Sequence, residues 1–211
     1  MLNIETGTTD WRGYALMTEE KPPPQRKATY EELVALPSRV VGEILGGELF
    51  ASPRPASPHS AASLALGASL MSPFQWDREG PDGWWFFVEP ELHLGKDVLV
   101  PDLAGWRRSR MTVRSNVSYF TLVPDWVCEV LSPSTEQIDR TLKQQIYARE
   151  GVEYLWLVHP VLRFMEVLKL HQGQWLRRGA WSGDALVHAE PFEALELKLG
   201  RLWFSESPAP D

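Results

Sequence analysis

Two acidic residues lie within apolar runs of the chain, Asp102 in the run 98–106 and Glu129 in the run 125–132. Both runs are rich in Val, Leu and Trp, as is typical of buried strands. An ionised carboxylate in such surroundings must be paired with a cation, accept hydrogen bonds or bind a metal. Because two carboxylates on neighbouring strands repel each other unless a cation lies between them, the runs favour a divalent-metal site. The residues alone leave an alternative, in which Asp102 caps a turn at a strand end and Glu129 pairs with a nearby arginine.

A helix predicted over 137–150 follows the Glu129 run and carries Asp139, Lys143 and Tyr147 on one face, because residues four apart lie on the same side of a helix. The ordinary interpretation is a surface ion pair between Asp139 and Lys143. The turn before the helix is short, however, so the helix can direct Lys143 back toward the carboxyl end of the Glu129 strand.

With Glu43 from an earlier predicted strand, these residues would form one catalytic group of Asp102, Glu129, Lys143 and Glu43. Carboxylates hold Mg²⁺ or Mn²⁺ through hard oxygen ligands and leave positions open for water and a phosphate. The ammonium of Lys143 can orient the water or stabilise charge that develops on the phosphate oxygens. The residue types therefore favour metal-dependent hydrolysis of a phosphodiester.

The charge of the chain limits how it could bind nucleic acid. A formal net charge of −7 over 211 residues argues against bulk electrostatic binding, which needs clustered Lys and Arg. No acidic residue lies between 103 and 124, and this segment carries the candidate substrate-phosphate contacts Arg107, Arg108, Arg110 and Arg114. A solvated loop with spare charge is the common alternative for such a segment.

The single cysteine, Cys128, cannot form an internal disulfide or a Cys-based zinc site. It lies in a strand-like run and is predicted to be a small buried hydrophobe. No apolar stretch reaches the length of a membrane span, and the N-terminus lacks the layout of a secretion signal. We therefore expect a cytoplasmic protein without a membrane partner.

Local signals predict the first elements of the fold. The capping-box spacing of Thr29 and Glu32 predicts a short helix, and Gly46-Gly47 predicts a tight turn between strands over 39–45 and 48–51. Ser57-Pro58 resembles an N-cap followed by a first-turn proline, and it predicts a helix that runs to about residue 72.

The later elements are mostly strands. They are predicted over 84–88 with a continuation to 94, then 98–106, 126–131, 153–159, 163–171, 174–178, 185–190 and 196–199, the last of these closing an edge. Gly151 is expected to end the helix over 137–150. One β-α-β passage from 129 to 158 favours an α/β or α+β fold, with a mixed sheet flanked by helices.

The ordered set of Pro101-Asp102, residues 129–135, Asp139, Lys143, Tyr147 and residues 151–158 resembles the Uma-type putative restriction endonucleases, a branch of the PD-(D/E)XK nuclease superfamily. The likeness extends back to 30–32, 42–44 and 47–49. It covers about 28–204 and implies a restriction-endonuclease-like domain there, with additional β-hairpins at both ends, followed by a tail over 205–211. Residues 1–27 are polar, without clear periodicity, and are predicted to be an N-terminal arm or linker. The resemblance also implies that Asp102 and Glu129 are metal ligands and that Glu43 is a supporting carboxylate.

One position departs from the superfamily pattern, which places a lysine two residues after the glutamate, where this chain has Leu131. In similar Uma-type proteins the lysine lies on the next helix, as Lys143 does here. The resemblance implies a Mg²⁺- or Mn²⁺-dependent DNA endonuclease that leaves a 5′-phosphate, and paired sites on a homodimer would suit cleavage of both strands. The alternatives are a catalytically silent nucleic-acid-binding or interaction module and a metal phosphoesterase acting on small molecules.

Overall fold

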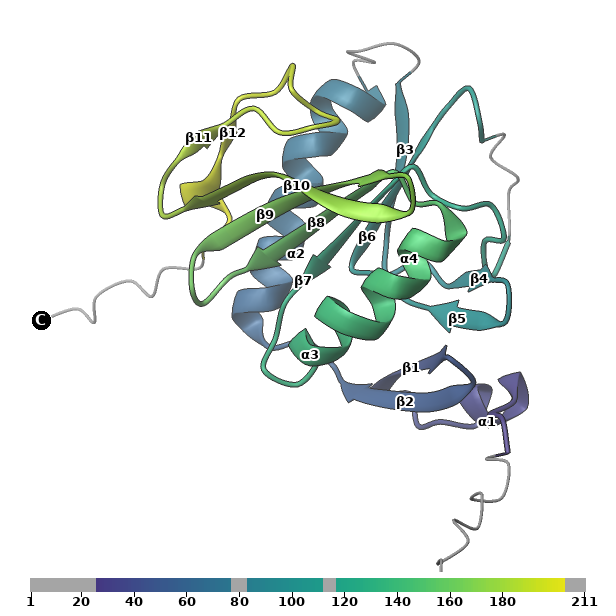
Figure 1. The fold of residues 1–211 in the computed structure, drawn as a ribbon. Helices are drawn as coiled ribbons and strands as arrows, with labels where there is room; N and C mark the ends of the chain where they lie inside the picture. The colour runs from purple at the N-terminus through teal and green to yellow at the C-terminus, as the bar shows by residue number, and fades with distance from the viewer. Residues whose placement is uncertain (1–25, 77–82, 112–116, 204–211) are drawn as a thin grey trace, which may run out of the picture.

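A six-stranded mixed sheet with helices on both faces forms the body of the protein, and a smaller sheet lies beside it (Figure 1). The computed structural model describes residues 26–76, 83–111 and 117–203. The large sheet has the order β10-β9-β8-β7-β6-β3. Its strands are β3 (Trp84–Val88), β6 (Leu103–Arg107), β7 (Trp126–Val130), β8 (Tyr154–His159), β9 (Phe164–His171) and β10 (Gln174–Ser182).

The parallel pair β7 and β8 is joined by one crossover, and the other neighbours in the large sheet are antiparallel. The crossover consists of α3 (Glu136–Ile138), a π-helical turn (Asp139–Lys143) and α4 (Gln144–Glu150). Gly151 ends α4 with φ = 85°, a left-handed conformation that glycine adopts without strain. The predicted β-α-β passage, its helix and its C-terminal glycine are confirmed.

The two faces of the large sheet carry separate apolar cores, because successive side chains of a strand point to opposite faces. On one face α2 (Ser57–Leu70) packs with Trp126, Cys128 and Val130 of β7, while α4 packs on the other face with Val127. Figure 1 shows α2 behind the sheet and α4 in front. Cys128 is fully buried, as predicted. By the same alternation, Glu129 faces α4.

The smaller sheet has the order β2-β1-β5-β4. Its strands are β1 (Val40–Leu45), β2 (Glu48–Pro53), β4 (Leu92–Leu94) and β5 (Asp97–Leu99). Helix α1 (Tyr30–Val34) precedes it, and the predicted capping box of Thr29 and Glu32 is present. The predicted hairpin is also present, with positive φ at both turn glycines.

Several predicted boundaries were wrong, two of them because the chain leaves the large sheet after β3 and returns to it at β6. The strand expected to continue from Val88 to residue 94 ends at Val88, and Glu89 turns the chain with φ = 45° toward β4. The strand expected over 98–106 is divided into β5 and β6, so Asp102 precedes a strand and does not lie within one. The cap of α2 is also corrected, since Ala56 occupies the N-cap position and Ser57 is the first helical residue.

The C-terminal segment covers the α2 face of the large sheet. Strands β11 (Leu186–Val187) and β12 (Leu197–Lys198) form a separate two-stranded sheet, followed by a 3₁₀ turn (Leu199–Arg201). The last predicted strand therefore does not close an edge of the large sheet. The aromatic ring of Phe192 contacts both Trp126 and Trp156 in that core. No helix in the described ranges is long and apolar enough to cross a membrane.

Candidate active site

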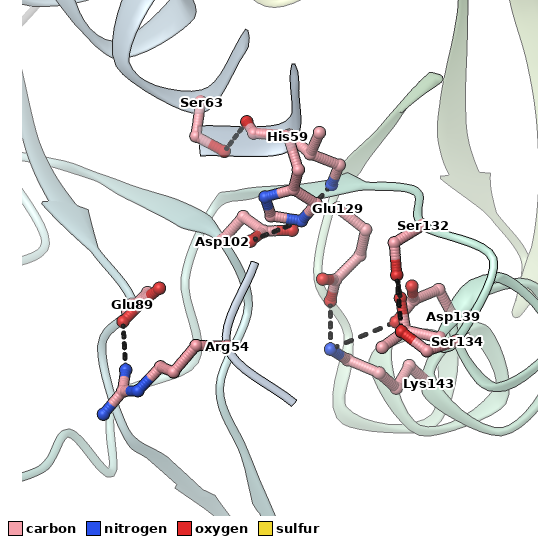
Figure 2. A network of polar contacts seen from close by, with 12 residues as sticks. Arg54, His59, Ser63, Glu89, Asp102, Glu129, Ser132, Ser134, Asp139 and Lys143 are labelled. Carbon is pink, nitrogen blue, oxygen red and sulfur yellow. Dashed lines mark hydrogen bonds and ion pairs between the residues drawn. The ribbon is translucent and has the colours of Figure 1, made fainter. Parts of the chain in front are cut away.

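Asp102 lies where the chain enters the large sheet from the small one. Its Oδ2 atom accepts a hydrogen bond from the backbone N–H of Val130 at 2.7 Å. The ladder between β6 and β7 begins only at Leu103, so this carboxylate satisfies a donor that the ladder leaves free. Its Oδ1 atom lies 3.2 Å from Nε2 of His59, in the first turn of α2 (Figure 2).

Glu129 is 2% exposed in the middle of the α4-facing core. Tyr147 of α4 donates a hydrogen bond from its hydroxyl to Oε1 of Glu129 at 2.5 Å, and Nζ of Lys143 lies 2.9 Å from the same oxygen. Burial raises the pKa of Glu129 well above its usual value, although the positive charge of Lys143 opposes the shift. A further cation near Glu129 would therefore favour its ionised form.

Lys143 lies among three carboxylates and is itself 3% exposed. Its Nζ is 2.9 Å from Glu129, 3.1 Å from Glu43 and 3.3 Å from Asp139. Burial lowers the pKa of Lys143, but the charge of Glu129 and then that of Glu43 outweigh burial and raise it well above its usual value. The lysine is therefore an ammonium. We call Lys143, Glu43, Glu129 and Asp139 the acid-rich cluster.

The sheet explains why a lysine from the helix can take the place of one on the strand. Residues 129 and 131 point to the same face, and Leu131 is buried there in the core that α4 covers. The helix that covers this face supplies Lys143. Its ammonium therefore contacts Glu129 on the same face of the sheet to which a lysine at position 131 would point. The structure thus places Lys143 where the sequence predicted it.

Glu43 connects the small sheet to this cluster. It lies on β1, and its Oε1 atom accepts a hydrogen bond from the backbone N–H of Val100 at 2.8 Å. Val100 follows β5 and stands two residues before Asp102. The side chain therefore fixes the chain segment that leads to Asp102 while it contacts Lys143.

A pocket of about 250 Å³ brings the predicted catalytic residues together. Asp102, Glu129, Lys143 and Glu43 all line it, as do Asp139 and His59. Three hydroxyl residues also line it, here named the hydroxyl cluster: Ser132, Ser134 and Thr135. The hydroxyl of Ser132 lies 3.0 Å from each of the other two hydroxyls. With Glu89 and Arg54, which also line it, the pocket has five carboxylates against one lysine, one arginine and one histidine among the described residues.

The residues of the pocket fit a divalent cation in chemistry and in charge. Their oxygen donors are the hard ligands that Mg²⁺ and Mn²⁺ prefer, and the excess of carboxylates favours a cation. Within the described ranges, no group of three or more His, Cys, Asp or Glu side chains is arranged so that it could hold a metal by itself. A magnesium site commonly needs only one or two carboxylates together with waters and substrate phosphates. Asp102 and Glu129 are two carboxylates that line this pocket.

The arginine segment lies elsewhere. Arg107 and Arg110 approach Oδ1 of the buried Asp125 at 2.7 and 2.6 Å. Arg108 stacks 3.7 Å over the ring of Trp85. None of these three lines the pocket, and Arg114 lies outside the described residues. Their contact with substrate phosphate stays a prediction, which the location of the pocket does not support.

Sequence reasoning did not assign His59 or the acidic Asp139 to the site. Burial lowers the pKa of His59, but its hydrogen bond to Asp102 and the charge of that carboxylate raise the pKa above its usual value. Nδ1 of the same ring is buried without a hydrogen-bond partner. The four-residue spacing of Asp139 and Lys143 on the predicted helix could have indicated that Asp139 lies beside Lys143 in the site. No residue near His59 in the sequence indicates its contact with Asp102.

Comparisons with known proteins give a consistent result. The sequence model of the Uma2 family, described as putative restriction endonuclease, matches residues 28–200. A crystal structure of a putative nuclease of the DUF820 family from Anabaena variabilis has a TM-score of 0.68 and 25% identity, and the match covers 83% of this chain and 97% of that one. A comparison with curated proteins found no match. The predicted resemblance and fold class are confirmed.

Proposed function

Because the chain belongs to the Uma2 family of putative restriction endonucleases, we propose that it is a metal-dependent endonuclease that hydrolyses phosphodiester bonds in DNA. The observation that carries the proposal is the position of the Lys143 ammonium, 2.9 Å from the buried carboxylate of Glu129 in the same pocket as Asp102. A lysine beside two carboxylates suits metal-dependent phosphodiester hydrolysis, and here the three residues come from separate segments of the chain.

Asp102 and Glu129 are the proposed ligands of Mg²⁺ or Mn²⁺, with Glu43 as a supporting carboxylate. When bound, such a cation polarises phosphate oxygens and makes a coordinated water easier to ionise. The hydrogen bond from Val130 and the contact with His59 fix both oxygens of Asp102 in place. His59 is therefore a positioning residue for Asp102, and Tyr147 has the same role for Glu129.

Lys143 assists the attacking water and stabilises negative charge on the phosphate oxygens. Its ammonium has three hydrogen-bond donors on a stem that is almost completely buried, so it stays close to Glu129 without substrate. A fixed positive charge acts more strongly in a pocket from which water is excluded than in bulk solvent. Attack by water on phosphorus with cleavage of the P–O3′ bond would leave a 3′-hydroxyl on one fragment and a 5′-phosphate on the other, and a homodimer would supply the second site for a duplex.

Cleavage of supercoiled plasmid with Mg²⁺ or Mn²⁺ tests this proposal. Wild type, Asp102→Asn and Lys143→Ala should be purified identically, so that a contaminating nuclease would act in all three. We expect wild type to nick the plasmid and both variants to lose more than about 100-fold in rate, since even partners that merely orient a metal ligand contribute about 10–100-fold. Equal cleavage by all three proteins would reject the site. Absence of cleavage by any of them would favour a silent binding module or a phosphoesterase.

A further inference from the structure

One ion pair lies on the rim of the pocket, between Arg54 and Glu89, and is here named the rim pair (Figure 2). Nη1 of Arg54 is 3.2 Å from Oε2 of Glu89, and the side chains are 55% and 37% exposed. Arg54 follows β2 and Glu89 follows β3, so the pair joins the small sheet to the large one at the mouth of the site. Both residues line the same pocket as Asp102.

Arg54 is the accessible cation of this pocket. Among the described residues that line it, Lys143 and Arg54 are the two with permanently charged basic side chains. Lys143 is buried and contacts three carboxylates, whereas Arg54 is half exposed and has one carboxylate partner. A guanidinium presents paired N–H donors that match two phosphate oxygens. A phosphate that enters the pocket therefore meets Arg54 before it meets Lys143.

Glu89 is held in place by its backbone. Its φ of 45° is unusual for a residue other than glycine, and its N–H donates to the carbonyl oxygen of Asp102 at 3.0 Å. Backbone conformations of this kind are often found at functional sites. The carboxylate of Glu89 is thus anchored beside Asp102 and occupies Arg54 while no phosphate is present.

Arg54 can exchange the carboxylate of Glu89 for a phosphate with little loss of stability. Exposed ion pairs contribute little to stability, because water screens the charges and two flexible side chains must be ordered. The additional contact of Arg54 with the carbonyl oxygen of Ser38, at 3.4 Å, is long and neutral. Little would therefore be lost if the guanidinium left Glu89 for a phosphodiester.

We propose that Arg54 binds a backbone phosphate of the cleaved DNA strand, adjacent to the phosphate at which cleavage occurs. Glu89 competes with this adjacent phosphate for the guanidinium of Arg54. The proposal rests on the proposed function and adds a substrate-binding residue to it. The hydroxyl cluster also lines the pocket and offers uncharged donors to the same strand. The rim pair then sets DNA affinity, while Asp102 and the acid-rich cluster perform the chemistry.

Binding of a fluorescently labelled oligonucleotide, single-stranded and duplex, measured by anisotropy in EDTA, tests the proposal without cleavage. We expect Arg54→Ala to weaken binding roughly 10- to 150-fold, as for the loss of hydrogen bonds from a charged donor. The slope of log affinity against log salt should fall by about one, because one phosphate contact is lost. Arg54→Lys should keep the slope but lose part of the affinity, since the paired donors are gone.

A double-mutant cycle tests the competition. Glu89→Gln should tighten binding roughly 2- to 5-fold, the range expected from freeing an exposed ion pair, and this gain should vanish in the Arg54→Ala background. Arg177→Ala is the matched control, because Arg177 is an exposed arginine of β10, paired with Glu166 at 3.8 Å away from the pocket. A gain from Glu89→Gln that persists without Arg54 would reduce the effect to general electrostatics and overturn the competition.

The outcomes separate this inference from the proposed function. If wild type cuts plasmid and Arg54→Ala matches Arg177→Ala in affinity and salt slope, Arg54 is not a phosphate contact, although the nuclease proposal stands. If wild type neither binds the oligonucleotide nor cuts plasmid, both proposals fail. Thermal melting of each variant must match that of wild type, so that altered binding reflects the contact and not the fold.

Discussion

Two of the ionic groups with buried carboxylates in the described part of the chain have opposite composition. In the acid-rich cluster one lysine faces three carboxylates at 2.9 to 3.3 Å. In the second group, here named the arginine cluster, the carboxylate of Asp125 faces Arg107 and Arg110 at 2.7 and 2.6 Å. Asp125 also accepts the backbone N–H of Arg107 at 2.8 Å. Arg107 also pairs with Glu153 at 2.9 Å. One group therefore has an excess of acid at a pocket, whereas the other has two arginines for two acids.

This difference separates a candidate for function from a candidate for stability. A buried charge that has all its partners holds elements together, and here Asp125 ties the segment after β6 to the start of β7. Ionised acids that are buried in excess of their cations are unfavourable unless a further cation binds. The raised pKa of Glu129 shows that its ionised form is unfavourable in this position. The ratio of acidic to basic side chains within each group therefore distinguishes the two groups better than the number of charged residues in a stretch of sequence does.

Removal of the single cation should have the largest effect on stability. In metal-free buffer Lys143→Met should lower the free energy of unfolding by about 3 kcal/mol or more, because it leaves buried carboxylates without their cation. Urea unfolding measures this loss. Lys198→Met, at an exposed position on β12, is the control and should stay within about 0.5 kcal/mol of wild type. A Lys143→Met protein as stable as wild type would mean that the cluster is not strained.

Neutralising Asp125 in the arginine cluster should have a smaller effect on the free energy of unfolding. Asp125→Asn should cost about 1.5 to 3 kcal/mol, the range for hydrogen bonds with a charged partner, because both arginines are partly exposed and can regain water. The plasmid-cleavage rate per folded molecule should not change. A variant with tighter DNA binding and faster cleavage would show instead that Asp125 restrains arginines that contact phosphate.

Metal should stabilise the acid-rich cluster and leave the arginine cluster unaffected. At ten times its dissociation constant, Mg²⁺ should raise the unfolding free energy of wild type by about 1.4 kcal/mol, since it binds only the folded state. Asp125→Asn should gain as much, and Asp102→Asn should gain nothing. Urea unfolding with and without Mg²⁺ makes the comparison, and an equal gain in Asp102→Asn would place the metal elsewhere.

The smallest expected effect is that of Arg110→Ala. Arg107 would still neutralise Asp125, so the loss of unfolding free energy should be below about 1 kcal/mol, as for an exposed pair. The salt slope of oligonucleotide binding should match that of wild type. A slope reduced by about one would identify Arg110 as a phosphate contact and return the segment to the site.

The sequence was sufficient for features that depend on neighbouring residues. Helix periodicity and a short preceding turn predicted that Lys143 would meet Glu129, and the glycines at 46, 47 and 151 predicted a hairpin turn and a helix end. In each case the physical cause acts within one or two turns of chain, so the pattern is visible without a fold.

Contacts between distant segments could not be predicted in this way. The pairing of His59 with Asp102 depends on α2 lying against the start of β6, and that of Arg107 with Asp125 depends on how β6 meets β7. The division of the chain between two sheets near Asp102 had the same cause, because both halves of the 98–106 run are equally apolar. An arginine-rich segment thus looked available for phosphate until its carboxylate partner was located.

The position of Lys143 on the crossover helix, and not two residues after Glu129, limits which insertions and deletions the site can tolerate. A lysine on β7 would keep its direction through the hydrogen bonds of the sheet, but Lys143 depends on the number of residues that separate it from Glu129. Each residue added or removed within the crossover helix would rotate the side chain by about 100° around the helix axis. Surface loops usually tolerate changes of length, yet the segment 131–143 contains a loop and a helix start whose length the site itself constrains.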